Sequence, residues 1–219
     1  MDTHPPIVRV GLLAALTLFL AEPALAQATT QQTNRELKRT GLATEALAGQ
    51  VVGVLPITHI SRDTALRDSL ITGPRAMVMH WADSVLGESL IGQTPEINWM
   101  LPPELRKASR KAAGMVPEPD RMGQSVMRSP RLDQVPDPLR GYLRTLMGIA
   151  GGRFVFIPAS ITAGKDSVGA IRLTLMAVLA DTRTGKVVWR ASNAFGTGRT
   201  PADALLAAVK TFLPDADSP

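Results

Sequence analysis

The chain of 219 residues contains no cysteine, which excludes disulfide bonds, thiolate metal sites, a cysteine nucleophile and a lipid-modified amino-terminal cysteine. Its three histidines leave little material for a histidine-rich metal centre. The sequence also lacks a Lys-Ser/Thr phosphate loop, a dinucleotide fingerprint and a paired metal-ligand spacing. Because 45% of the residues are hydrophobic, the chain is expected to fold. The missing motifs favour a domain that carries no cofactor and no metal.

Long apolar runs are also missing, and the one short run lies near the start. Residues 1–26 have the pattern of a secretory signal peptide, with Arg9 before an apolar run and the small-x-small sequence Ala24-Leu25-Ala26 at its end. The run is about half of the ~20 residues that a membrane span needs. We therefore expect cleavage before Gln27 and export to a bacterial periplasm, without lipidation and without a remaining transmembrane span. Retention of the segment is the alternative.

Composition divides the remaining chain into three parts. Residues 27–49 begin Gln/Thr-rich and predict a flexible or loosely helical tether. Residues 50–213 carry the apolar patterns of one α/β domain, and residues 214–219 predict a disordered tail. Inside the domain, residues 114–138 hold five prolines and no clear periodicity. They predict a loop longer than the ~12–15 residues usual within a compact domain.

The apolar patterns within the domain predict the order β-α-β-α-loop-α-β-β-β-α. The expected strands cover residues 51–57, 96–101, 153–161, 170–180 and 187–192. The expected helices cover residues 74–91, 102–111, 139–150 and 201–212. Residues 59–73 are polar and predict an irregular connection. Helices between the early strands, followed by an antiparallel meander, favour a single mixed sheet with helices packed against it, in the α/β or α+β class.

Three sequence phrases carry a resemblance to a known family. They are Val51–Ile57, Gly152–Ile157 and Val178–Trp189, the last containing a D-x-x-T-G-x-x-x-W hairpin. They resemble secreted bacterial α/β domains that include the TolB amino-terminal domain, CsgG-type assembly proteins and periplasmic lipoproteins that activate peptidoglycan synthases. The resemblance implies a non-enzymatic envelope domain that binds other proteins. The absent cysteine is a departure from the family's lipoproteins.

The expected helix at residues 102–111 carries a cluster of basic residues. Arg106, Lys107, Arg110 and Lys111 share one helix face because of their i, i+1, i+4 and i+5 spacing. On a chain with a formal net charge of +5, this face predicts binding to a partner protein, or peripheral contact with an anionic lipid or glycan. A solvated helix face is the simpler alternative. Nucleic acid is not expected, given export and the low aromatic content of 4%.

Two functions from different classes follow from these features. The preferred one is an exported, non-enzymatic periplasmic binding or scaffold domain. It would support envelope assembly or transport through contacts with envelope proteins or with copies of itself. The alternative is a periplasmic hydrolase-type enzyme centred on His59, which follows the first strand and has Ser61 and Asp63 close by in sequence.

Overall fold

The computed structural model describes residues 41–64, 66 and 69–213. The predicted signal peptide at 1–26, most of the predicted tether and the tail at 214–219 lie outside the described residues. Within these ranges no helix has the length and apolar character that crossing a membrane requires.

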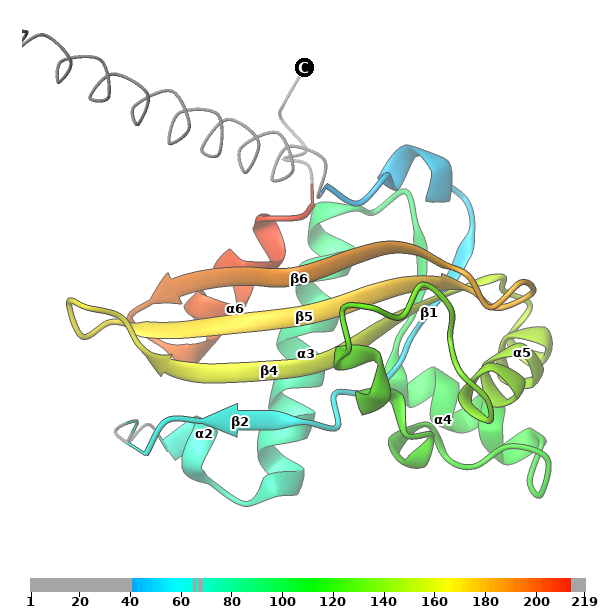
Figure 1. The fold of residues 1–219 in the computed structure, drawn as a ribbon, viewed down its shortest axis with the longest axis horizontal. Coiled ribbons are helices and arrows are strands. Elements are labelled where there is room, and N and C mark those ends of the chain that lie inside the picture. Colours follow the sequence, from blue (N-terminus) through cyan, green and yellow to red (C-terminus); the bar gives the residue numbers. More distant parts are fainter. Residues whose placement is uncertain (1–40, 65, 67–68, 214–219) are drawn as a thin grey trace, which may run out of the picture. The chain divides into compact units, whose positions relative to one another are not determined.

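Six strands form one mixed sheet, in the order β3-β1-β4-β5-β6 with β2 beside β4 (Figure 1). The strands are β1 Val51–Val54, β2 Ile60–Arg62, β3 Asn98–Met100, β4 Phe154–Lys165, β5 Ile171–Asp181 and β6 Val187–Gly198. Strand β1 pairs in parallel with β3 and β4, and β2 pairs in parallel with β4. Strands β4, β5 and β6 form an antiparallel meander. The predicted mixed sheet with packed helices is confirmed.

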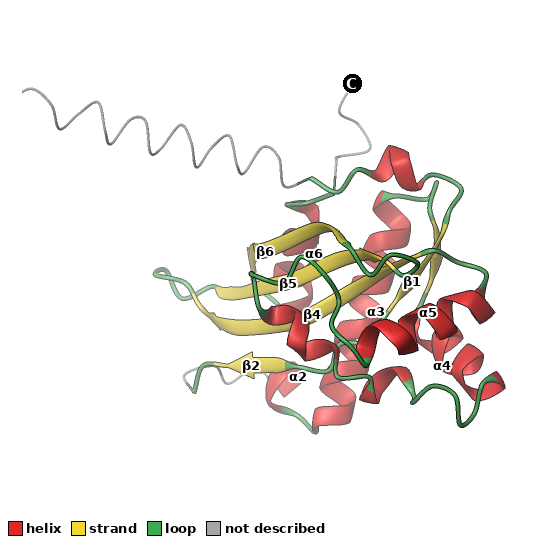
Figure 2. Ribbon diagram, turned by 45° about the vertical axis from the view of Figure 1, so that its right-hand side comes forward, coloured by secondary structure: helices red, strands yellow, loops and turns green. Residues whose placement is uncertain are grey.

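The helices cover both faces of this sheet (Figure 2). The helices are α2 Ser69–Thr72, α3 Arg75–Gln93, α4 Pro102–Lys111, α5 Leu139–Ala150 and α6 Pro201–Lys210. Three 3-10 turns accompany them, η1 Thr44–Leu47, η2 Pro119–Arg121 and η3 Gln124–Arg128. The four longer helices match the sequence prediction closely. The prediction was wrong for residues 59–73, where β2 and α2 form, because a three-residue strand and a four-residue helix leave no periodic signal.

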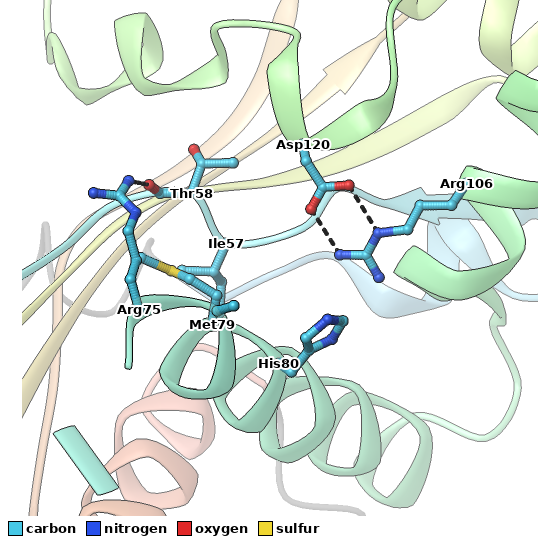
Figure 3. Close-up of a pocket in the computed structure, with 8 residues that line it drawn as sticks. Ile57, Thr58, Arg75, Met79, His80, Arg106 and Asp120 are labelled. Carbon is cyan, nitrogen blue, oxygen red and sulfur yellow. Dashed lines mark hydrogen bonds and ion pairs between the residues drawn. The ribbon is translucent and has the colours of Figure 1, made fainter. Parts of the chain in front are cut away.

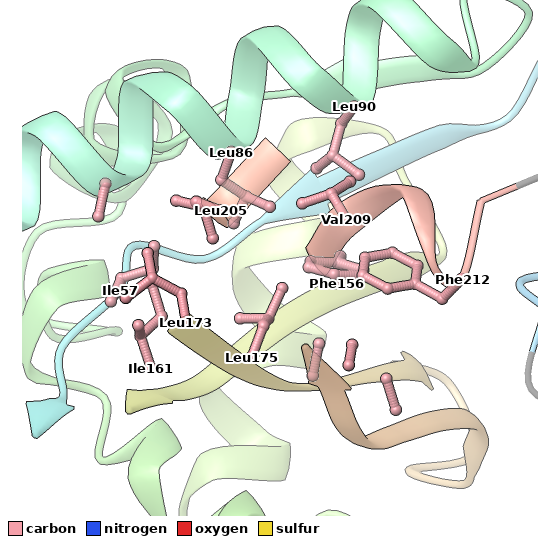
Figure 4. Close-up of a cluster of buried hydrophobic side chains, with 14 of the residues drawn as sticks. Ile57, Leu86, Leu90, Phe156, Ile161, Leu173, Leu175, Leu205, Val209 and Phe212 are labelled. Atoms are coloured by element: carbon pink, nitrogen blue, oxygen red, sulfur yellow. The ribbon is translucent and has the colours of Figure 1, made fainter. Parts of the chain in front are cut away.

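Helices α3 and α6 pack on one face and bury the larger hydrophobic cluster (Figure 4). Figure 4 shows side chains of the two helices directed at the strands, among them Leu86, Leu90, Leu205 and Val209, together with Phe212, which follows α6. Helix α6 lies very close to β6 because Gly196 has no Cβ. A Cβ there would collide with the helix backbone at Ala204 and Ala208. The glycine therefore sets the spacing between the helix and the sheet.

Residues 42–49 also belong to this domain. Leu42 and Leu47 are buried in the same cluster, and the Leu42 N–H donates to the Phe212 carbonyl at 2.7 Å. The tether predicted from sequence ran to residue 49, and the structure differs over this last part. Two leucines are too few to give a periodic pattern, yet they are enough to attach the segment to the core.

The other face is covered by α4, α5 and the proline-rich segment 114–138. The apolar side chains that this segment buries include Val116, Met122, Met127 and Val135. It is also tied to the sheet, because the Arg190 guanidinium of β6 donates to the carbonyls of Met127 and Leu132 at 2.8 and 2.6 Å. The segment is irregular, as predicted, but it packs against the sheet as a helix would.

Candidate binding surface

Helix α4 holds the basic residues that the sequence singled out, and its orientation follows from its amphipathic pattern. Pro102 opens the first turn, and the Glu104 carboxylate accepts a hydrogen bond from the Leu101 N–H at 2.7 Å. Leu105 and Ala108 are buried in the second cluster. Since the apolar side faces the sheet and α5, the basic side of the helix faces outward.

Arg106 is the exception among the four basic residues, because its charge is engaged by two carboxylates. Its Nε and Nη2 atoms donate to the two carboxylate oxygens of Asp120, each at 2.8 Å (Figure 3). Nη2 also donates to Asp83 Oδ2 at 3.2 Å. The other Asp83 oxygen accepts the Ile57 N–H at 2.7 Å. Arg106 thus joins α3, α4 and η2 and holds α4 in place.

Burial decides the charge behaviour of this network. Asp83 is 8% exposed, and its burial raises its pKa to about 6, although the Ile57 N–H and Arg106 favour the ionised form. The hydrogen bonds with Arg106 lower the pKa of the more exposed Asp120, and the same bonds raise the pKa of Arg106. Arg106 therefore acts as a positioning residue whose charge is already compensated.

The three remaining cations, Lys107, Arg110 and Lys111, are exposed. Within the described part of the chain none of their side chains makes a hydrogen bond or an ion pair. They lie within about one helical turn of each other on a helix fixed by Arg106. We call these three residues the cationic face of α4. The sequence predicted one shared face for all four basic residues; the structure leaves these three exposed there and pairs Arg106 with Asp120 and Asp83.

A cleft of about 410 Å³ lies beside the Arg106–Asp120 pair (Figure 3). Its other walls are Ile57 and Thr58 after β1, and the first turns of α3 with Arg75, Met79 and His80. Arg75 Nη2 donates to the Thr58 carbonyl at 2.7 Å. Among the residues that the structure describes, no group of three or more His, Asp or Glu side chains is placed to hold a metal ion.

Sequence reasoning missed Asp83 and Asp120, the two carboxylates of this region. The sequence does contain a signal for Asp83, because this carboxylate falls among the helix positions that α3 buries, directly after Ala82. A carboxylate among buried helix positions requires a partner, and that partner is Arg106. Asp120 gives no such signal, because it comes from the irregular segment, whose path the sequence does not define.

His59 does not have the surroundings that the hydrolase alternative needs. Its Nε2 lies 3.1 Å from Arg128 Nη1, and because arginine only donates, this ring nitrogen acts as the acceptor. Burial first, and then the charges of Arg128 and Arg75, lower the pKa of His59. Ser61 Oγ lies 3.0 Å from Thr162 Oγ1 and 3.5 Å from the Ile161 carbonyl. A general base needs a free lone pair and an orienting acceptor for its other nitrogen, and the Arg128 contact occupies the lone pair.

The fold has distant likenesses among solved structures, which include LpoB, the lipoprotein GNA1162 from Neisseria meningitidis and PelC. The LpoB C-terminal domain from Salmonella enterica is 14% identical, covering 70% of this chain and 84% of that chain, with a TM-score of 0.39. LpoB from Escherichia coli is 13% identical, covering 90% and 80%, with a TM-score of 0.38. A PelC dodecamer from Paraburkholderia phytofirmans is 14% identical, covering 78% and 92%, with a TM-score of 0.36.

No family model matches the chain, and no curated protein matches it. At TM-scores below 0.5 we draw no conclusion about function from the structural likenesses. The resemblance to TolB and CsgG proteins stays a prediction.

Proposed function

We propose that this chain is an exported, non-enzymatic binding or scaffold domain of the bacterial periplasm. It supports envelope assembly or transport through protein–protein contacts at the cationic face of α4. The observation that carries the proposal is the set of exposed cations Lys107, Arg110 and Lys111 on a helix held by the double ion pair of Arg106. The export signal and the family phrases in the sequence support the same reading.

The physical reason is that charged side chains on a helix already held in place need little rearrangement when a partner binds. Exposed lysine and arginine side chains on a rigid helix steer an acidic surface toward them. Because Arg106 is already paired, α4 does not have to reorganise when the three outer cations meet that surface. The partner is therefore expected to be an envelope protein, or another copy of this chain, with an acidic patch at the contact.

Photo-crosslinking in intact cells tests this proposal. A photoreactive amino acid replaces Lys107 or Lys111 in the full chain, and the same amino acid at Arg183, an exposed position in the β5–β6 turn, is the control. We expect one envelope protein, or the chain itself, to be captured from the α4 positions and not from Arg183. The same products from all three positions, or no adduct at any expression level, would count against the proposal.

Charge variants separate the candidate partners. In the chain that carries the photoreactive amino acid at Lys107, replacement of Arg110 and Lys111 by Gln is compared with replacement of the exposed Arg183 and Arg199 by Gln, so that both variants lose the same charge. Only the first should lose the crosslinked partner. Purified protein is also sedimented with vesicles of anionic or neutral lipid and with isolated cell-wall glycan. If the protein binds anionic vesicles or glycan, loses that binding in the α4 variant and gives no protein adduct, the surface is assigned to that lipid or polymer instead.

A further inference from the structure

Strand β6 forms one edge of the sheet, and its last five residues lack the usual protection of an edge strand. It pairs with β5 on one side, and in the described ranges no backbone hydrogen bond reaches Val188–Gly198 from the other side. The pairing with β5 shifts register near Ala191 and Val187, whereas Ala194–Gly198 pairs without interruption with Ile171–Leu175. An uninterrupted edge with free N–H and C=O groups is a template for another strand.

Natural edge strands are protected by bulges, prolines, charged side chains or short length. The stretch Ala194–Gly198 has the sequence Ala-Phe-Gly-Thr-Gly, without a charge, a proline or a bulge. At the opposite edge, β3 is protected by its length of only three residues. In this stretch Phe195 and Thr197 are exposed, while Ala194 and Gly196 are buried under α6. Its outer side, without a backbone partner in the described ranges, is therefore a specific feature of this end of the sheet.

The side chains beside this edge indicate what it would bind. Phe195 is 46% exposed and pairs with Thr174 on β5. It lies on the sheet face opposite α6, because the neighbouring Ala194 and Gly196 face the helix. The Arg172 guanidinium of β5 lies over the Phe195 ring, 4.4 Å from its centroid. An exposed aromatic ring that carries an arginine offers an apolar contact and a positive charge together.

We propose that Ala194–Gly198 is an acceptor edge for an extended segment of a partner protein, which adds to the sheet as a further strand. The segment places an apolar or β-branched side chain on Phe195 and an acidic side chain next to Arg172. Main-chain hydrogen bonds supply the affinity, and these two side chains supply the selectivity. A second copy of this chain fits less well, because pairing of two β6 strands would bring two Arg172 residues to the same face.

Short capped synthetic peptides test the proposal. They alternate Thr and Val and differ only at one central position, which is Glu or Lys. Fluorescence anisotropy with the full chain is expected to show roughly tenfold tighter binding of the Glu peptide. Arg172→Glu should reverse the preference. Lys165→Glu makes the same change in net charge at the exposed end of β4 and should preserve it. Phe195→Ala should weaken both peptides.

Hydrogen exchange shows whether the peptide binds the edge. Amides of Ala194–Gly198 should gain protection in the complex, while those of Asn98–Met100 at the opposite edge should not. Equal binding of the two peptides, no binding by either, or binding without added protection at β6 would overturn the proposal. Self-association that Phe195→Ala abolishes would overturn it in favour of a second copy. The residues involved are separate from the cationic face of α4, so each proposal can fail without the other.

Discussion

Asp83→Asn tests the charge network directly, because it keeps the shape of the side chain and removes only its ionisation. Asp83 Oδ1 accepts the Ile57 N–H at 2.7 Å, and the oxygen of an asparagine can accept the same bond. The amide nitrogen then faces Arg106, which can only donate. The stability of the variant at any one pH therefore combines the gain from removing a buried charge with the loss of the contact to Arg106. The dependence of stability on pH isolates the contribution of the carboxylate.

The sign follows from proton binding in the two states. The pKa of Asp83 is raised from its usual 3.8 to about 6 in the folded protein, so between these values the folded state binds more protons than the unfolded state. The free energy of unfolding that Asp83 contributes is therefore highest below about pH 4 and falls as pH rises toward 6. A pKa difference of this size between the folded and unfolded states corresponds to about 3 kcal/mol in the free energy of unfolding.

Urea unfolding of the two proteins between about pH 4 and pH 7 measures this contribution. The free energy of unfolding of the unmodified protein, relative to that of Asp83→Asn, should fall by about 3 kcal/mol over this range. Glu88→Gln removes an exposed carboxylate from the same helix and is the matched control for loss of charge. Parallel stability curves for the unmodified protein and Asp83→Asn would refute the reasoning, since the buried carboxylate would then cost nothing to ionise.

Three further outcomes are expected. Gly196→Ala should destabilise the domain by about 1–3 kcal/mol, because the new Cβ collides with the backbone of α6. Gly148→Ala is the control, because its new Cβ meets open space on α5, and it should be neutral or slightly stabilising. Thermal unfolding measures both variants. Arg190→Gln should speed limited proteolysis within residues 114–138, since two hydrogen bonds to that segment are lost. His59→Ala should leave the cellular phenotype unchanged, and a loss of function there would revive the enzyme alternative.

The regular elements of this fold could be predicted from the sequence because each has a repeating apolar pattern. The strand meander from β4 to β6 and the helix α4 follow from such patterns, as does the shared face of Lys107, Arg110 and Lys111. The pairing of Arg106 could not be predicted in the same way. It depends on Asp120, whose position is set by packing of an irregular segment rather than by local periodicity.

The same limit explains β2. Its three residues take strand conformation only because β4 extends far enough to pair with them, with Ile60 opposite Ile161. A segment that depends on a distant strand for its structure carries little of that information in its own residues. Tertiary contacts override local preference most easily in such short segments.

The interruption between β1 and β2 gives two buried polar side chains, Asp83 and Gln124, a common origin. Both strands pair with the same side of β4, but residues 56–58 between them leave the regular ladder. A buried backbone group that loses its strand partner must find another. The Ile57 N–H finds the carboxylate of Asp83, and the Pro56 carbonyl accepts from the buried amide of Gln124 at 3.1 Å. The two side chains therefore act as substitutes for a missing neighbour strand, and the Arg106 network and its cleft exist because the sheet is broken at that point.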